Sequence, residues 1–183
     1  MRRIRYQVAA SLDGYIAGPN GEADWITMDP DIDFTALFDQ FDTFVMGRAT
    51  YEAMVGQQGS GATPGKTTVV ISRTLRQQDH PDVTVVSDYV EKTLTALRKK
   101  PGKDIWLFGG GSLFRSLLEM RLVDTIETAI IPVLLGGGIP LLPPATSRVK
   151  LKLTGHRVYK KSGIVLLEYA ISYPRAQKAK SRS

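Results

Sequence analysis

The chain has 183 residues, 43% of them hydrophobic and 23% charged, which is the composition of a globular protein with room for one full domain core. It contains no cysteine, which excludes disulfides, thiolate nucleophiles and cysteine metal sites. No apolar run approaches the ~20 residues of a membrane helix, and the amino terminus lacks the apolar core of a signal peptide, so we expect a cytoplasmic protein.

The formal net charge is +6, and four basic residues without an accompanying acid lie in the last nine positions: Arg175, Lys178, Lys180 and Arg182. The rest of the chain therefore carries only about +2. We predict one domain over residues 1–173, followed by a solvated, disordered basic tail over 174–183. A nucleic-acid-binding arm is the alternative for the tail, although aromatic and basic residues do not interleave elsewhere in the chain.

The chain begins with a predicted strand over residues 4–10, where apolar residues alternate. Asp13 and Gly14 form a turn pair, and residues 15–17 briefly resume the strand. The segment that follows is polar and rich in glycine up to an isolated Trp25, which predicts a mobile loop anchored by one aromatic side chain. Such a loop can close over a ligand, whereas ordinary packing of the indole is the alternative.

An amphipathic helix is predicted between residues 31 and 41, because four apolar residues share one helical face: Phe34, Leu37, Phe38 and Phe41. Asp29, Asp31 and Asp33 crowd its first turn. Carboxylates are favourable there because they face the positive end of the helix dipole.

Two predicted strands then end in residues that suit an anion. The strand over residues 43–46 ends at Gly47 and Arg48, where a helical segment begins and where Thr50 adds a hydroxyl group. The strand over residues 67–71 ends at Ser72 and Arg73. A guanidinium can donate two hydrogen bonds to one phosphate group, which makes both arginines candidate phosphate ligands.

A third junction, residues 105–120, reads as strand, glycine turn and helix. Gly109, Gly110 and Gly111 interrupt an apolar strand, Ser112 stands at the predicted N-cap, and the helix buries one face: Leu113, Phe114, Leu117 and Leu118. A helix that begins at glycines leaves its N–H groups open to an anion. The glycines do not spell G-x-G-x-x-G and no G-K-[ST] pair is present, which argues against a standard Rossmann domain and a P-loop. A sharp turn without a ligand is the alternative.

The remaining pattern predicts a strand over 83–86, a helix over 90–99 and a strand over 125–135 with a bulge or edge at Pro132. Gly136 to Gly138 are predicted to form a bulge or turn. Two final strands, 150–159 and 164–172, are joined by a hairpin. This order predicts an α/β fold with a largely parallel sheet, helices on both faces and an antiparallel edge. Ligands of such sheets lie at the carboxyl ends of the strands.

Four segments, in this order and spacing, resemble the dihydrofolate reductase superfamily: ASLDGYIA, FVMGRATYEAM, TVVIS and IWLFGGGSLF. The likeness is greatest to the branch related to the RibD-type C-terminal reductase domain of bacterial riboflavin biosynthesis, and it spans nearly the whole chain up to the tail. The resemblance implies a dihydrofolate-reductase-like three-layer α/β/α fold with a mostly parallel mixed sheet and a C-terminal antiparallel hairpin. It also implies an NADP-dependent oxidoreductase, similar to 5-amino-6-(5-phosphoribosylamino)uracil reductase, that forms a homodimer.

Carried over motif by motif, the resemblance implies a cofactor site for NADP(H). Ala10, Ile16 and Ala17 would line the nicotinamide, and Gly47, Arg48 and Thr50 would hold the phosphate region. Ser72 and Arg73 would bind the adenosine and its 2′-phosphate, while the pyrophosphate would lie against Gly109, Gly110, Gly111, Ser112 and Leu113. Two arginines suit NADP better than NAD, because the extra phosphate is a dianion.

The substrate half of the resemblance is less close. Folate reductases hold the pterin with a carboxylate on the first helix; the candidates here are Asp33 and Asp31, and neither has the family's spacing. Asp24 also stands where folate reductases have proline. In the RibD-like branch Asp13 would lie near the substrate pocket, although it could equally be a turn former. We predict Asp33 as the proton donor, with an ordered water as the alternative, and Asp13, Trp25 and Asp31 as substrate-binding residues.

The resulting hypothesis is an NADPH-dependent reductase that transfers hydride to a small heterocyclic, pterin- or pyrimidine-like, or sugar-imine substrate. Hydride transfer requires mainly that the two reactants are held together, which fits the absence of a catalytic triad motif. His80 and His156 are the only histidines, so few side chains are available for histidine acid–base chemistry or for binding a metal. A non-catalytic nucleotide- or ligand-binding protein on the same fold is the alternative, and neither nucleic acid nor membrane is an expected partner.

Overall fold

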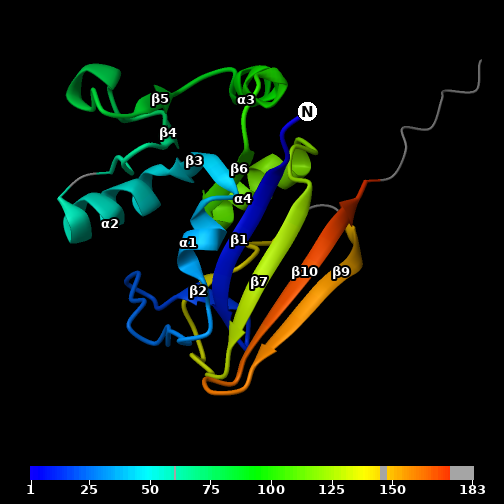
Figure 1. The fold of residues 1–183 in the computed structure, drawn as a ribbon. Coiled ribbons are helices and arrows are strands. Elements are labelled where there is room, and N and C mark those ends of the chain that lie inside the picture. Colours follow the sequence, from blue (N-terminus) through cyan, green and yellow to red (C-terminus); the bar gives the residue numbers. More distant parts are fainter. Residues whose placement is uncertain (60, 145–147, 174–183) are drawn as a thin grey trace, which may run out of the picture.

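An eight-stranded sheet runs through the centre of the molecule (Figure 1). The computed structural model describes residues 1–59, 61–144 and 148–173, and the tail predicted over 174–183 lies outside them. The strand order is β5 (Thr84–Val86), β4 (Thr67–Ile71), β3 (Phe41–Gly47), β6 (Asp104–Gly109), β1 (Ile4–Ser11), β7 (Thr125–Ile131), β10 (Ile164–Ser172) and β9 (Lys150–Tyr159). The first six strands are parallel, and β10 and β9 form the antiparallel edge, as predicted.

Helices cover both faces of this sheet. Side chains of α1 (Phe34–Phe38) and α2 (Arg48–Gln58) pack on one face, whereas α3 (Val90–Lys99) and α4 (Gly111–Glu119) pack on the other. A short 3₁₀ turn, η1 (Gln77–Asp79), precedes β5, and a small separate ribbon pairs β2 (Tyr15–Ala17) with β8 (Ile139–Pro140). The predicted three-layer arrangement is confirmed. Within the described ranges, no helix is long and apolar enough to cross a membrane.

The first helix is shorter than predicted. The expected helix over residues 31–41 is reduced to α1, with Asp33 as its N-cap: Asp33 Oδ1 accepts a hydrogen bond from the Ala36 N–H at 2.9 Å. At the other end, Lys66 Nζ donates to the carbonyl oxygens of Phe38 and Phe41, at 3.0 and 2.7 Å. Phe41 is the first residue of β3. The Lys66 ammonium group therefore binds the chain at the point where the helix ends and the strand begins.

Two other predicted boundaries are corrected. The N-cap of α4 is Gly110, and Ser112 lies inside the first turn of the helix. The strand predicted over residues 125–135 ends at Ile131 as β7, directly before Pro132. Proline has no N–H group to donate to a neighbouring strand, which explains the early end.

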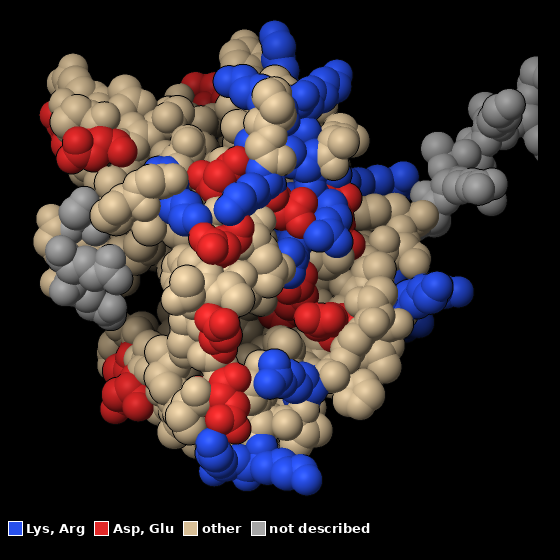
Figure 2. Space-filling view, in the orientation of Figure 1, with Lys and Arg blue, Asp and Glu red and all other residues tan. Residues whose placement is uncertain are grey.

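Ion pairs concentrate at the end of the sheet where the chain begins. Figure 2 shows basic and acidic side chains interleaved in this region. Arg98 binds both carboxylate oxygens of Asp124 at 2.8 Å, Arg3 pairs with Asp104, and Arg2 pairs with Asp42. The pairs of Arg2 and Arg3 join the first residues of the chain to β3 and β6. Arg98 Nε also donates to the Arg2 carbonyl oxygen at 3.1 Å, and the Ile4 N–H donates to Asp124 at 2.8 Å. These contacts hold the amino ends of the strands together.

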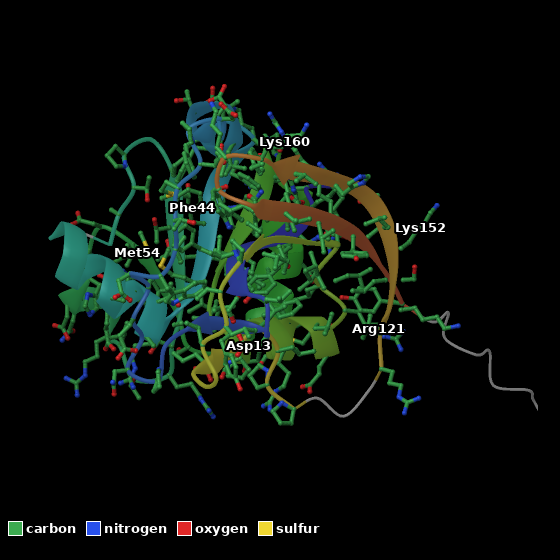
Figure 3. All side chains as sticks on the ribbon, turned by 90° about the horizontal axis from the view of Figure 1, so that it is seen from below. Asp13, Phe44, Met54, Arg121, Lys152 and Lys160 are labelled. Carbon is green, nitrogen blue, oxygen red and sulfur yellow. The ribbon has the colours of Figure 1, made fainter. Side chains whose placement is uncertain are left out.

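The core beneath α1 and α2 is aromatic. Met54 of α2 packs against the cluster that contains Phe44 of β3; both residues are labelled in Figure 3. Trp106 of β6 packs against Phe38 and Phe41, with ring centroids 5.2 and 4.9 Å apart. The Trp106 indole N–H donates to the Gln7 carbonyl oxygen at 2.9 Å. The large rings bury apolar area while this polar atom remains paired.

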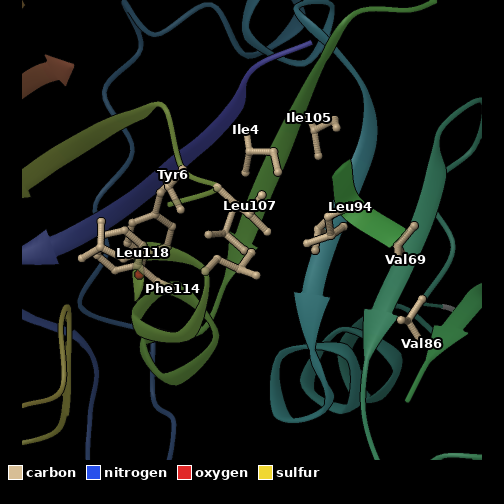
Figure 4. Close-up of a cluster of buried hydrophobic side chains, with 13 residues drawn as sticks. Ile4, Tyr6, Val69, Val86, Leu94, Ile105, Leu107, Phe114 and Leu118 are labelled. Atoms are coloured by element: carbon tan, nitrogen blue, oxygen red, sulfur yellow. The ribbon is translucent and has the colours of Figure 1, made fainter. Parts of the chain in front are cut away.

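The core beneath α3 and α4 is mainly aliphatic (Figure 4). Ile4 and Tyr6 of β1, Leu94 of α3 and Phe114 of α4 are fully buried there. The rings of Tyr6 and Phe114 stack with centroids 4.0 Å apart. The Tyr6 hydroxyl is buried and has no hydrogen-bond partner among the described residues, and burial raises its pKa. The hydroxyl therefore loses its hydration without a compensating contact.

We expect Tyr6→Phe to leave the free energy of unfolding unchanged or to raise it by up to about 1 kcal/mol, because the ring packing stays and the unpaired hydroxyl is removed. Tyr173→Phe is the matched control. The Tyr173 hydroxyl donates to the Val123 carbonyl oxygen at 2.8 Å, so its loss should cost about 1 kcal/mol. Urea unfolding of both variants measures the difference, and a clear destabilisation by Tyr6→Phe would contradict it.

The loop before α1 is fastened to the turn between β9 and β10. Asp29 is only 2% exposed and accepts hydrogen bonds from the N–H groups of Asp31 and Ser162, both at 2.9 Å. Asp31 in turn pairs with Lys161 at 2.8 Å. The prediction that Asp29 and Asp31 lie in the first turn of the helix is therefore wrong. Both residues hold the loop against the antiparallel edge of the sheet instead.

Hydrogen bonds from Ser162 are the largest cause of a lowered pKa of Asp29. A lowered folded-state pKa stabilises the fold above the unfolded value of about 3.9, and this contribution disappears as pH falls through the folded value. We expect Asp29→Asn to unfold more easily than the wild type at about pH 7, and the gap to narrow towards about pH 3. Thermal unfolding across this range tests it, with the exposed Asp24→Asn as control. A gap independent of pH would contradict the expectation.

Candidate cofactor and substrate site

The two central strands separate at their carboxyl ends. β1 and β6 pair from Ile4 and Ile105 to Tyr6 and Leu107, although β1 continues to Ser11. Strands that follow β1 in the chain lie on both sides of it in the sheet, so the strand order reverses at this point. In open parallel sheets this is where a crevice for a ligand forms.

Two helix amino termini meet beside this separation. Met46 of β3 pairs with Gly109 of β6, so α2 and α4 start side by side. Their N-caps, Gly47 and Gly110, are both extended and lack a side-chain cap. The open N–H groups and the positive dipole ends favour an anion.

The glycines at these helix starts allow close approach. A Cβ atom on Gly109 would lie 3.1 Å from Thr50 Oγ1, and one on Gly47 would lie 3.8 Å from Leu113 Cβ. Gly109 has a φ of 157°, and its peptide bond to Gly110 is cis. The structure thus brings together residues of two separate segments: Thr50, Leu113 and the glycine turn. The crowding at Gly109 gives a physical reason for glycine there beyond a simple turn.

Ser72 and Arg73 lie at the same edge, because Ile71 of β4 pairs with Gly47 of β3. Ser72 is buried, and its Oγ accepts hydrogen bonds from the N–H groups of Thr74 and Leu75, at 3.2 and 3.1 Å. Ser72 therefore shapes the turn that carries Arg73. The Arg73 side chain is exposed and has no partner among the described residues. Arg48, also exposed, makes only a long 3.8 Å contact with Glu52.

The residues predicted to line the nicotinamide complete this edge. Ala10 is fully buried near the end of β1, and Ile16 and Ala17 belong to the β2–β8 ribbon. The ribbon lies against α4, since a Cβ atom on Gly111 would be 2.5 Å from the Pro140 carbonyl oxygen. All the predicted cofactor residues therefore lie along the carboxyl ends of β1, β3, β4 and β6. Their binding roles remain predictions.

A cavity of about 420 Å³ opens on the sheet face that carries α1. It lies between β1, β7, β9 and β10 on one side, and α1 and the loop before it on the other. Its walls are mostly apolar: Ile26, Ile32, Ala129, Ile131, Ile164 and Leu166. Trp106 and Tyr159 add aromatic surface. The size and apolar lining suit a small flat molecule.

A buried ion pair forms part of the cavity lining. Arg5 donates from Nε and Nη2 to the two oxygens of Glu127, at 2.6 and 2.5 Å, and from Nη1 to Gln40 at 2.8 Å. Thr125 and Gln7 also donate to Glu127. Burial by itself would lower the pKa of Arg5, but hydrogen bonds and charge from Glu127 outweigh it, and the pKa is raised. The guanidinium and the carboxylate thus compensate each other within the cavity lining.

Among the four residues predicted for catalysis and substrate binding, Asp33 lines the cavity, and Asp13, Trp25 and Asp31 are absent from the described lining. Trp25 packs beside the cavity wall, and its N–H donates to the Glu22 carbonyl oxygen. Asp31 is exposed and paired with Lys161. Asp33 uses one oxygen as the α1 cap, and its other oxygen has no partner among the described residues.

Asp13, labelled in Figure 3, fastens two loops. It accepts hydrogen bonds from the Ser11 hydroxyl at 2.6 Å and from the N–H groups of Leu135 and Gly136 at 3.2 and 2.8 Å. The bond from Ser11 is the largest cause of its lowered pKa. A carboxylate held ionised in this way is a poor proton donor. These contacts match the alternative reading of Asp13 as a turn former.

Sequence reasoning missed several polar residues of the cavity: Arg5, Gln7, Glu127, Arg157 and Glu168. A signal existed, because Glu127 and Glu168 are single charges inside apolar strands, TIETAII and IVLLEYAIS. A charge in such a position is seldom buried without a partner or a function. Which of them face one another depends on strand register, which the sequence pattern does not specify.

Comparison with known proteins agrees with this geometry. Residues 2–165 match the family described as the RibD C-terminal domain. The chain is 36% identical over 179 residues to the uncharacterised protein YyaP of Bacillus subtilis (strain 168), covering 92% of this chain and 94% of YyaP. A solved structure from Shewanella sp. PV-4, provisionally assigned to riboflavin biosynthesis, superposes with a TM-score of 0.78 at 28% identity, covering 94% of this chain and all of that one.

A dihydrofolate reductase from Enterococcus faecalis, solved with NADP(H), superposes with a TM-score of 0.65 at 22% identity, covering 92% of this chain and 94% of that one. This likeness concerns the fold, and it confirms the dihydrofolate-reductase-like α/β arrangement. The matched range includes β1 to β7 and their helices, together with β9 and the start of β10. The chain therefore belongs to the RibD C-terminal domain family.

Proposed function

We propose that the protein is an NADPH-dependent reductase acting on a small heterocyclic substrate of the pterin or pyrimidine type, or on a sugar imine. The observation that carries the proposal is that the sheet edge with the glycine turn and the two helix starts lies next to the cavity. Both are built on β1: Ala9 lines the cavity, and the adjacent Ala10 lies at the separated end of β1 and β6. A substrate in the cavity and a cofactor at the separated strand ends would therefore meet at β1.

The glycine turn and the two helix starts would bind the pyrophosphate, and Arg48 and Arg73 would bind the 2′-phosphate. Both arginines are exposed, and neither has a close carboxylate partner among the described residues, which leaves their guanidinium groups available for a dianion. The backbone at Ala10, Ile16 and Ala17 would support the nicotinamide. When bound, NADPH supplies the hydride; the protein orients the two reactants and excludes water.

Asp33 is the proposed proton source for the reduced substrate. It is the predicted carboxylate that borders the cavity, and one of its oxygens is held by the first turn of α1. The other oxygen is directed neither to a described cation nor to a described N–H group. The carboxyl group could therefore act directly or through an ordered water.

We expect Arg73→Ala to weaken NADPH binding about tenfold and NADH binding much less, because a charge-assisted contact to the 2′-phosphate is lost. Isothermal titration calorimetry measures both affinities. Arg76→Ala, which removes an exposed arginine three residues further along, is the matched control and should change neither affinity.

An equal loss for both nucleotides would remove Arg73 from the 2′-phosphate site. Failure of the wild type to bind either nucleotide would refute the proposed function. Binding of NADPH without its oxidation across a panel of pterins, pyrimidines and sugar imines would favour a non-catalytic ligand-binding protein.

We further propose a homodimer that buries one face of β9 and β10. Leu151, Leu153 and Val158 of β9 are 45, 51 and 55% exposed, on the sheet face opposite the cavity. Val165 and Leu167 of β10 extend this apolar face. The helices α3 and α4 pack on the same side but over β1 and β6, and β9 and β10 extend away from them in Figure 1. An apolar surface of this kind is typical of a protein interface.

We expect Leu153→Asp to convert the dimer to a monomer in light scattering coupled to size-exclusion chromatography, because a charge would be buried in the interface. Leu134→Asp, at an equally apolar position that is 69% exposed and outside this face, should leave the dimer intact. A monomeric wild type, or a dimer unaffected by Leu153→Asp, would contradict the proposal.

A further inference from the structure

Glu168 is a cavity-lining carboxylate without a partner. It lies on β10, half-buried, and no described residue forms a hydrogen bond or ion pair with its side-chain oxygens. On the neighbouring strand β7, the residue directly opposite Glu168 is Glu127. Arg5 compensates the charge of Glu127, so Glu168 is the carboxylate of this pair that is left without a partner among the described residues. The Glu168 carboxylate is therefore available to accept a hydrogen bond from a ligand in the cavity.

The sheet makes room for this carboxylate. On the other side of β10, Glu168 pairs with Gly155 of β9, and a Cβ atom on Gly155 would overlap Glu168 Oε2. The strand pairing shifts by one residue just beyond this point. The missing side chain of Gly155 thus leaves the notch in which the Glu168 carboxylate lies. The backbone of β9 positions the acid without neutralising it.

The other charges of the cavity show which ligand chemistry remains. Arg5 and Glu127 neutralise each other, so Glu168 and Asp33 are the unpaired negative groups of the described lining. Arg157 is the corresponding unpaired cation, and its guanidinium lies 4.8 Å from the ring centroid of Tyr159. A phosphate dianion is bound by several donors or by clustered arginines. The charged groups that the described lining leaves unpaired are instead two carboxylates and one guanidinium, and Gln7 adds an unpaired amide oxygen, which is also an acceptor.

We propose that Glu168 determines substrate specificity, and that the cavity takes a neutral or cationic heterocycle with an exocyclic amino group, without a phosphate. The amino group would donate to Glu168 at the cavity lining, while the apolar walls hold the ring. This inference rests on the proposed function only in taking the cavity as the substrate site. It assigns Glu168 a role in selecting the ring, separate from the proton transfer proposed for Asp33.

The test compares two probes of nearly equal shape, 4-aminopyrimidine and 4-methylpyrimidine, by isothermal titration calorimetry at saturating NADPH. The wild type should prefer the amino compound about tenfold or more, because the methyl group cannot donate to a carboxylate. Glu168→Gln should remove most of this preference. Gly155→Ala, which displaces the carboxylate and keeps its charge, should also reduce it. Glu91→Gln, an exposed acid on α3, is the matched control and should bind as the wild type does.

A second arm compares cytidine with cytidine 5′-monophosphate, and we expect the phosphate to give no gain in affinity. A gain of about tenfold would overturn the phosphate-free part of the proposal. An amino preference that survives Glu168→Gln in a folded variant, or no preference in a wild type that binds NADPH, would overturn the role of Glu168. Because NADPH affinity is measured separately in every variant, either failure is distinguishable from failure of the cofactor site itself.

Discussion

The rest of the structure depends on the early end of pairing between β1 and β6. At their amino ends the two strands are held by backbone pairing and by the ion pairs of the first residues, including Arg3 with Asp104. Beyond Tyr6 and Leu107 this pairing is lost, while β1 continues beside β7 to Ser11. Backbone groups and glycine-started helices can then face a ligand at the centre of the sheet. A fully paired β1 and β6 would close that space.

Alternation along β1 links this edge to the cavity. Successive side chains point to opposite faces, so Ile4 and Tyr6 enter the core with α3 and α4, whereas Arg5, Gln7 and Ala9 face the cavity. The Arg5–Glu127 pair is costly to bury, but its hydrogen bonds from Thr125 and Gln7 and to Gln40 satisfy both ions. Its closure also leaves Glu168 and Asp33 as the acids available to a ligand. The cavity lining thus contains one ion pair with a structural role and two carboxylates that are available to recognise a ligand.

Much of the fold followed from local patterns. The strands at 67–71, 150–159 and 164–172 and the helix at 90–99 have the predicted bounds, because alternation or a helical face is unbroken there and polar residues or turns bound the segments. The first helix was overpredicted. Its apolar spacing continues to Phe41, but Phe41 pairs in β3 and Lys66 binds the carbonyls at the helix end. Such a long-range contact leaves no trace in local periodicity.

The sequence by itself determined the order of elements, the glycine and arginine residues at three strand ends, and the family to which they point. It did so because these features are local, and a glycine turn or a helical stripe acts within a few residues. Only the tertiary structure decided which carboxylates border the cavity. Asp13 and Asp31 are drawn into loop contacts, and Glu127 and Glu168 meet across β7 and β10. Strand register brings together residues far apart in the chain, and that register is set by packing of the whole sheet.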